Sequence, residues 1–106
     1  MTKGDTVTVK LLGRLDGENP GNLRRVIAQM LVENDRMVVD CSKLEYMNSE
    51  GLGALISCLR IAISSGGDIR LAEVMPSVKI MLELTRADKV FQIYVTTEDA
   101  VASFNS

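Results

Sequence analysis

The chain has 106 residues, of which 46% are hydrophobic and 25% are charged, and this is the composition of a folded domain. Its formal net charge of −2 and the lack of any basic block argue against a nucleic-acid partner, since nucleic-acid binding usually needs a basic face. The longest apolar runs are only a few residues, so we expect no transmembrane helix, signal peptide or membrane insertion, and one domain over residues 1–106.

The first third of the chain predicts a strand followed by a helix. Residues 6–12 alternate polar and apolar side chains, as a half-buried strand does, with a bulge at Gly13 and a turn at Gly17. Asn19 and Pro20 together predict an N-cap and a first helical position. The helix that follows has one apolar stripe, made of Leu23, Val26, Ile27, Met30 and Leu31, and ends near residues 34–35.

The remaining elements continue the alternation of strand and helix. A short apolar strand over residues 37–40 leads into a polar loop over residues 43–50 and then into a helix whose apolar residues lie between Leu52 and Ile63. Ser64-Ser65-Gly66-Gly67 predicts the end of that helix. The later elements are a strand at residues 69–72, a helix from Pro76 to about Arg86, a strand at residues 91–95 and a helix capped by Thr97 and running to about Phe104. This order predicts an α/β fold with a largely parallel sheet and right-handed crossovers.

The polar loop is the most informative segment. Lys43–Glu50 follows a strand directly, as does Gly13–Asn19, so both are expected at the carboxyl edge of the sheet, where sites form in folds of this class. The loop also precedes a helix, whose first backbone N–H groups and dipole favour negative charge. A group that adds or removes an anion here is therefore a candidate switch.

Residues that could support catalysis are few. Asp40, Glu45 and Glu50 could form a carboxylate pair, but nothing fixes their spacing, and solvated loop and helix-start charges explain them as well. Ser49 lacks a histidine to activate it, since the chain contains none, and Gly51-Leu52-Gly53 lacks the rest of a dinucleotide fingerprint. We expect no enzyme, no metal site and no cofactor.

The two cysteines lie in the predicted second strand and second helix. Cys41 and Cys58 have no metal-binding spacing and no other ligands near them in sequence. They are interpreted as two buried thiols in a reducing compartment, which predicts a cytoplasmic protein.

Residues 40–55, Asp-Cys-Ser-Lys-Leu-Glu-Tyr-Met-Asn-Ser-Glu-Gly-Leu-Gly-Ala-Leu, closely resemble the STAS domain of bacterial anti-sigma factor antagonists. Members of that family carry a stretch like Asp-Leu-Ser-x-Leu-x-x-Met-Asp-Ser-Ser-Gly-Leu-Gly. The segments Gly13–Asp16, Gly66–Ile69 and Met75–Lys79 also look like family landmarks, although the N-terminal strand region is shorter than in longer members. The resemblance implies a single STAS-like domain with a four- to five-stranded mixed sheet, about four helices and no catalytic activity.

The resemblance also implies a partner and a switch. Family antagonists bind an anti-sigma factor that is also a serine kinase of the GHKL type, which releases the sigma factor and so regulates transcription. The kinase phosphorylates the second serine of Asp-Ser-Ser-Gly, the pair separates, and a phosphatase resets the cycle. A phosphate adds about −1.5 to −2 charge at the mouth of the helix.

This chain departs from the family pattern at the switch itself. Asn48 replaces the usual Asp, Ser49 matches the first serine, and Glu50 occupies the phospho-acceptor position. Three interpretations follow: Glu50 partly imitates the phosphorylated state, Ser49 is the acceptor instead, or the domain has left phospho-switching and serves another assembly. Ser49 could also be the N-cap of the second helix, and Glu50 could simply complement the helix dipole.

The expected partner-binding surface is the Lys43–Gly53 loop and the start of the second helix. Its candidate residues are Asp16, Tyr46, Met47, Gly51 and Leu52. Asp16 could instead only form a turn, and Tyr46 and Met47 could pack beneath the loop. The alternative function is a non-enzymatic STAS subunit of a transporter-associated or signalling assembly. The sequence fixes neither an oligomeric state nor nucleotide binding near residues 13–19.

Overall fold

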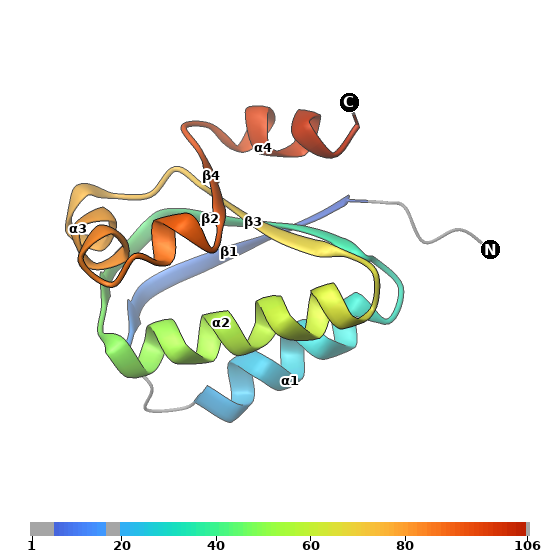
Figure 1. Cartoon of the computed structure of the whole chain (residues 1–106), viewed down its shortest axis with the longest axis horizontal. Coiled ribbons are helices and arrows are strands. Elements are labelled where there is room, and N and C mark those ends of the chain that lie inside the picture. The colour runs from blue at the N-terminus through green and yellow to red at the C-terminus, as the bar shows by residue number, and fades with distance from the viewer. Residues whose placement is uncertain (1–5, 17–19, 106) are drawn as a thin grey trace.

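In the described part of the chain, four strands form one sheet in the order β1-β2-β3-β4, and every neighbouring pair is parallel. The computed structural model describes residues 6–16 and 20–105 (Figure 1). The strands are β1 (Thr6–Leu15), β2 (Arg36–Met47), β3 (Asp68–Ala72) and β4 (Gln92–Tyr94). The helices are α1 (Pro20–Leu31), α2 (Ser49–Ser64), α3 (Pro76–Leu84), the short 3-10 helix η1 (Ala87–Lys89) and α4 (Thr97–Phe104). The predicted α/β class is confirmed, and within the described residues the sheet is parallel with no antiparallel component.

The sheet separates two unequal layers of helices. In Figure 1, α1 and α2 lie on one face and α4 lies on the other, with α3 at the end where the strands finish. Alternate side chains of β2 lie on opposite faces of the sheet. Met37 and Val39 belong to the main core, and Val38 packs with Ala72 and Ala100 beneath α4. The short, apolar start of β2 is explained by this burial on both faces.

The second strand is much longer than predicted, because it continues through most of the predicted polar loop. Residues 43–47 pair with the end of β1, and the loop prediction is therefore wrong up to Met47. Leu44 and Met47 are buried, while Glu45 and Tyr46 between them are exposed. This three-residue spacing departs from strict alternation because the register shifts between Gly13 and Arg14, where Glu45 is an extra residue of β2. The pairing contains two register shifts. One of them lies next to Gly13, where a bulge was predicted, but the extra residue is Glu45 of β2; Gly13 itself has a φ of +73°.

The helix boundaries agree well with the sequence, and the differences are one residue of the apolar stripe of α1 and the cap of α4. The first helix begins at Pro20 as predicted, while Gly17 and Asn19 lie outside the described residues. Within its predicted stripe, Val26 is exposed, whereas Ile27 and Leu31 are buried. The fourth helix is capped by Thr96 and not by Thr97, because the Thr96 hydroxyl accepts a hydrogen bond from the Asp99 N–H at 3.0 Å. Among the described residues, no helix combines the length and apolar character needed to cross a membrane.

Candidate functional site

The candidate switch lies where β2 passes into α2 through a single residue, Asn48. Asn48 is extended, with φ −104° and ψ −176°, and its side-chain oxygen accepts a hydrogen bond from the Gly51 N–H at 2.9 Å. Its own N–H donates to the Leu15 carbonyl at 3.2 Å. Asn48 is therefore the N-cap of α2, and the interpretation of Ser49 as the cap is wrong. An asparagine one position earlier already supplies the acceptor that the first turn needs.

A close approach of two backbones fixes the mouth of α2 against the end of β1. A Cβ atom on Gly51 would lie 2.0 Å from the Leu15 carbonyl oxygen and 2.6 Å from its carbonyl carbon. Both atoms belong to the backbone, so they cannot rotate aside. Gly51 is therefore needed for packing, and it lets the first turn of α2 rest directly on β1.

The side chains of Met47 and Leu52 point into the protein and not toward a partner. They are only 3% and 4% exposed and belong to the main core. Of the expected partner-binding residues, these two and the buried Gly51 form the support beneath the surface. The alternation of β2 explains the placement of Met47, because Tyr46 takes the outward position next to it.

Ser49 and Glu50 are the exposed residues of the first turn. The Ser49 hydroxyl forms no hydrogen bond with any part of the chain that the structure describes. Glu50 places one negative charge in the first turn, where it complements the helix dipole. The first turn of α2 thus presents a solvated carboxylate at position 50 and an accessible hydroxyl at position 49.

Asp16 and Tyr46 come together through a residue that the sequence analysis missed. The Arg14 guanidinium carbon lies 4.1 Å from the centre of the Tyr46 ring, and Arg14 Nε lies 3.8 Å from an Asp16 carboxylate oxygen. Arg14 and Tyr46 are direct cross-strand partners at the ends of β1 and β2. The alternation of β1 places the Arg14 side chain on the solvent side. This alternation is visible in the sequence and could have identified Arg14 as a surface residue. Tyr46 is 40% exposed, so the stacked pair is part of the surface.

The three candidate carboxylates do not form a shared site around Asp40. An Asp40 carboxylate oxygen accepts a hydrogen bond from the Ser42 N–H at 2.9 Å within β2. Burial opposes ionisation of Asp40, but the hydrogen bonds from Ser42 and the nearby Lys10 and Lys43 ammonium groups outweigh it and lower the pKa of Asp40. Asp40 thus stabilises an irregular part of the strand, while Glu45 and Glu50 are exposed.

Both cysteines are buried free thiols, as the sequence predicted. Burial, with a contribution from Asp40, raises the pKa of Cys41 to about 12, and burial also raises the pKa of Cys58. The thiolate form that acts as a nucleophile is therefore suppressed in the folded protein.

Comparison with known proteins identifies the family. The family model described as "Mlab, STAS domain" matches residues 1–96. An anti-sigma F factor antagonist of Paenibacillus polymyxa is 25% identical over 88 residues, covering 81% of this chain and 75% of its own length. BtrV of Bordetella bronchiseptica, also described as an anti-sigma factor antagonist, is 25% identical over 107 residues and covers 96% and 92% of the two chains.

Solved structures share the same fold. An anti-sigma factor antagonist of Thermotoga maritima superimposes with a TM-score of 0.82 at 24% identity, over 93% of this chain and 88% of that one. A sulfate transporter family protein of Wolinella succinogenes reaches a TM-score of 0.82 at 12% identity, over 94% and 84% of the two chains. Both kinds of protein therefore share the fold of this chain. The chain belongs to the STAS domain family.

Proposed function

We propose that this protein is an anti-sigma factor antagonist, a binding module that captures an anti-sigma factor and thereby regulates sigma-dependent transcription. The observation that carries the proposal is the exposed Ser49–Glu50 pair on a rigid helix start, held by the Asn48 cap and by the contact of Gly51 with Leu15. The names of the relatives from Paenibacillus and Bordetella support the same role.

The proposed binding surface combines the first turn of α2 with the rim beside it. Ser49 and Glu50 supply a hydroxyl and a carboxylate, and the rim supplies Asp16, Arg14 and Tyr46. Tyrosine and arginine are enriched among the residues that dominate binding energy, and here they are already stacked on each other. A prestacked pair loses less conformational entropy when a partner arrives.

We propose that the partner is a serine kinase of the GHKL type and that Ser49 is the phospho-acceptor, one residue before the family position. The cap interaction uses Asn48, which leaves the Ser49 hydroxyl accessible at the start of α2. A phosphate there would add about −1.5 to −2 charge beside the Glu50 carboxylate. Glu50 alone supplies one charge and two oxygens, so it imitates a phosphate only in part. Phosphorylation would then repel or displace the partner, and a phosphatase would restore binding.

The test is incubation with ATP and the cognate anti-sigma kinase, followed by intact mass and peptide mapping. The native chain is compared with Ser49→Ala, with Glu50→Ser and with Ser57→Ala, which removes a serine about two turns further along α2. We expect one phosphate in the native chain and in Ser57→Ala, mapped to Ser49, and none in Ser49→Ala.

The other outcomes select among the alternatives. If only Glu50→Ser is modified, the native chain has lost its acceptor, and its affinity for the kinase should then be compared with that of Glu50→Ser. If no variant is modified or bound, the proposal of sigma control is refuted. The alternative is then a non-enzymatic STAS subunit of another assembly, which the likeness to a sulfate transporter family protein favours.

The proposal also places the protein in the cytoplasm and gives it no catalytic activity of its own. The lack of histidine in the sequence and the suppressed thiolates of the two cysteines support a binding role over nucleophilic or general-base catalysis. Protein–protein recognition through an exposed helix start needs neither.

A further inference from the structure

A hollow of about 500 Å³ lies where β3 and β4 end. Val74 follows the end of β3 and Val95 follows the end of β4, while α3 and η1 complete the wall. Open parallel sheets bind ligands beyond the carboxyl ends of their strands. The volume also lies within the range of roughly 300–1,000 Å³ that is typical of small-molecule sites.

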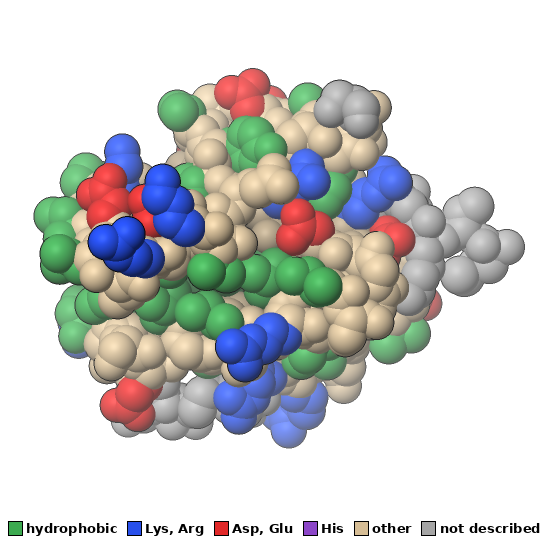
Figure 2. All heavy atoms as spheres, viewed as in Figure 1, with side chains coloured by type: hydrophobic (Ala, Val, Ile, Leu, Met, Phe, Trp, Pro, Cys, Tyr) green, Lys and Arg blue, Asp and Glu red, His purple; other side chains and the backbone are tan. Residues whose placement is uncertain are grey.

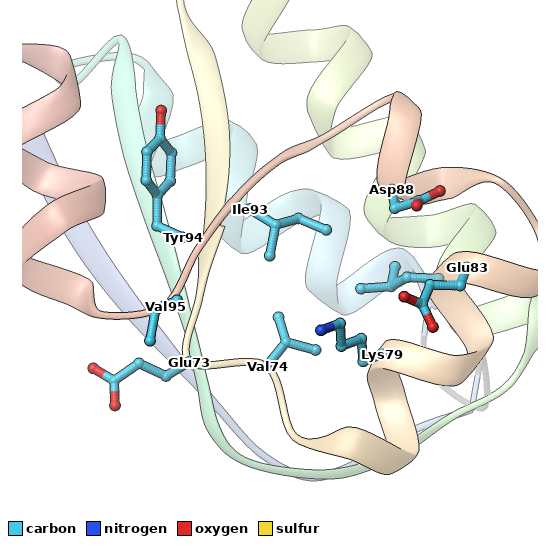
Figure 3. Close-up of a pocket in the computed structure, with 9 residues that line it drawn as sticks. Glu73, Val74, Lys79, Glu83, Asp88, Ile93, Tyr94 and Val95 are labelled. Carbon is cyan, nitrogen blue, oxygen red and sulfur yellow. The ribbon is translucent and has the colours of Figure 1, made fainter.

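The floor of this hollow is apolar. Val74 and Ile93 point into it, as Figure 3 shows, and the buried Leu82 lines it from α3. At its edge, Val95 is 84% exposed. The space-filling view in Figure 2 shows apolar side chains along this face of the molecule, beside the charges of the α3 and η1 region. An apolar body bound here would remove this surface from water.

One positive charge is directed at the hollow. The Lys79 ammonium points toward its middle, between Val74 and Ile93 (Figure 3). Lys79 forms no ion pair with any carboxylate in the part of the chain that the structure describes. A cation in this position can meet an anionic group whose apolar part lies on the floor.

The carboxylates around the hollow are arranged differently. Those of Glu73 and Asp88 point away from the middle in Figure 3. The Glu73 carboxylate is also occupied, because it accepts hydrogen bonds from the Thr97 N–H at 3.0 Å and from the Thr97 hydroxyl at 2.7 Å. Glu83, one turn after Lys79, is the exposed carboxylate on the α3 rim and would weaken the binding of an anion.

The geometry points to a binding site for a small organic carboxylate, with its apolar body on Val74 and Ile93 and its head group on the Lys79 ammonium. This site is distinct from the Ser49–Glu50 surface and does not depend on the proposed partner. It predicts selectivity by charge: an acid should bind better than an alcohol or an amine with the same apolar chain.

The test uses hexanoate, hexanol and hexylamine as probes of the full chain, followed by amide chemical shifts in NMR titrations. Hexanoate should shift the Val74, Ile93 and Val95 resonances with a lower Kd than either other probe. Lys79→Met keeps an unbranched side chain one atom shorter and removes the charge. It should raise the Kd for hexanoate about tenfold, the factor expected for a charge-assisted hydrogen bond. Glu83→Gln should lower it by about twofold.

Lys89→Met is the matched control, because it removes an exposed lysine of η1 that does not line the hollow. It should leave the Kd for hexanoate unchanged. Tighter binding of hexylamine than of hexanoate would overturn the proposal, since the carboxylates around the hollow, and not Lys79, would then determine which charge the site prefers. An equal Kd for native protein and Lys79→Met, or the absence of shifts around the hollow, would overturn it as well.

Discussion

Replacing Gly51 by alanine isolates the contact that fixes the mouth of α2. The new Cβ would lie 2.0 Å from the Leu15 carbonyl oxygen, far inside the closest ordinary contact. Its helical backbone needs no positive φ, so the cost comes from the clash and not from conformational strain. Overpacking of this kind costs about 1–3 kcal/mol of folding free energy. The upper part of that range is expected here, because the clashing atoms belong to the Leu15 backbone and cannot rotate away.

Gly53→Ala supplies the matched control in the same helix. A Cβ on Gly53 meets nothing within 4 Å, so Gly53→Ala gains the higher helix propensity of alanine without introducing a clash. Alanine is more favourable than glycine in a helix by roughly 0.5–1 kcal/mol. We therefore expect Gly53→Ala to be stabilised by about that amount and Gly51→Ala to be destabilised by about 1–2 kcal/mol after the same gain is counted.

Urea unfolding followed by circular dichroism measures both variants. With a slope of roughly 1–3 kcal/mol per molar urea, the midpoint should fall by about 0.5–1 M in Gly51→Ala and rise slightly in Gly53→Ala. If the two midpoints move in the same direction by similar amounts, the contact between Gly51 and Leu15 does not constrain the fold and the reasoning is wrong. Binding of the partner proposed above should weaken only in Gly51→Ala, because its clash displaces the surface that carries Ser49.

Three further predictions concern the cap, an acid titration and the thiols. Asn48→Ala removes the cap of α2 and should lower the free energy of unfolding by ~1 kcal/mol, whereas Asn48→Asp should keep the cap; thermal unfolding measures both. The lowered pKa of Asp40 stabilises the fold above the ordinary carboxyl value of 3.8, and this stability is lost as the pH falls through the folded pKa. In Asp40→Asn, the free energy of unfolding should therefore fall less steeply as the pH is lowered through the acid range. An unchanged pH dependence in this range would contradict the prediction. Cys41 and Cys58 should react with iodoacetamide only after urea unfolding, and mass spectrometry of the native protein checks this.

The sequence alone determined the order of the elements and which segment is the candidate switch. Alternation in residues 6–12 and the apolar stripe before residue 34 report which face of each element is buried, and this is local information. Pro20 marks a helix start because its ring fixes φ, and the Ser64–Gly67 segment marks a helix end because Gly66 adopts a positive φ of +85° without steric cost. The motif around Asn48 was enough to identify the STAS family, which the family model confirms.

Tertiary structure decided which of the marked residues form the surface. The length of β2 depends on a partner strand, because residues 43–47 become a strand only by pairing with β1. Pairing with β1 also placed Arg14 over Tyr46, while Met47 went into the core. The need for glycine at position 51 arises from Leu15, a residue 36 positions away, and the hollow beside Lys79 exists only where β3, β4 and α3 meet. Local periodicity reports which face of an element is buried, but contacts between distant segments decide what covers that face.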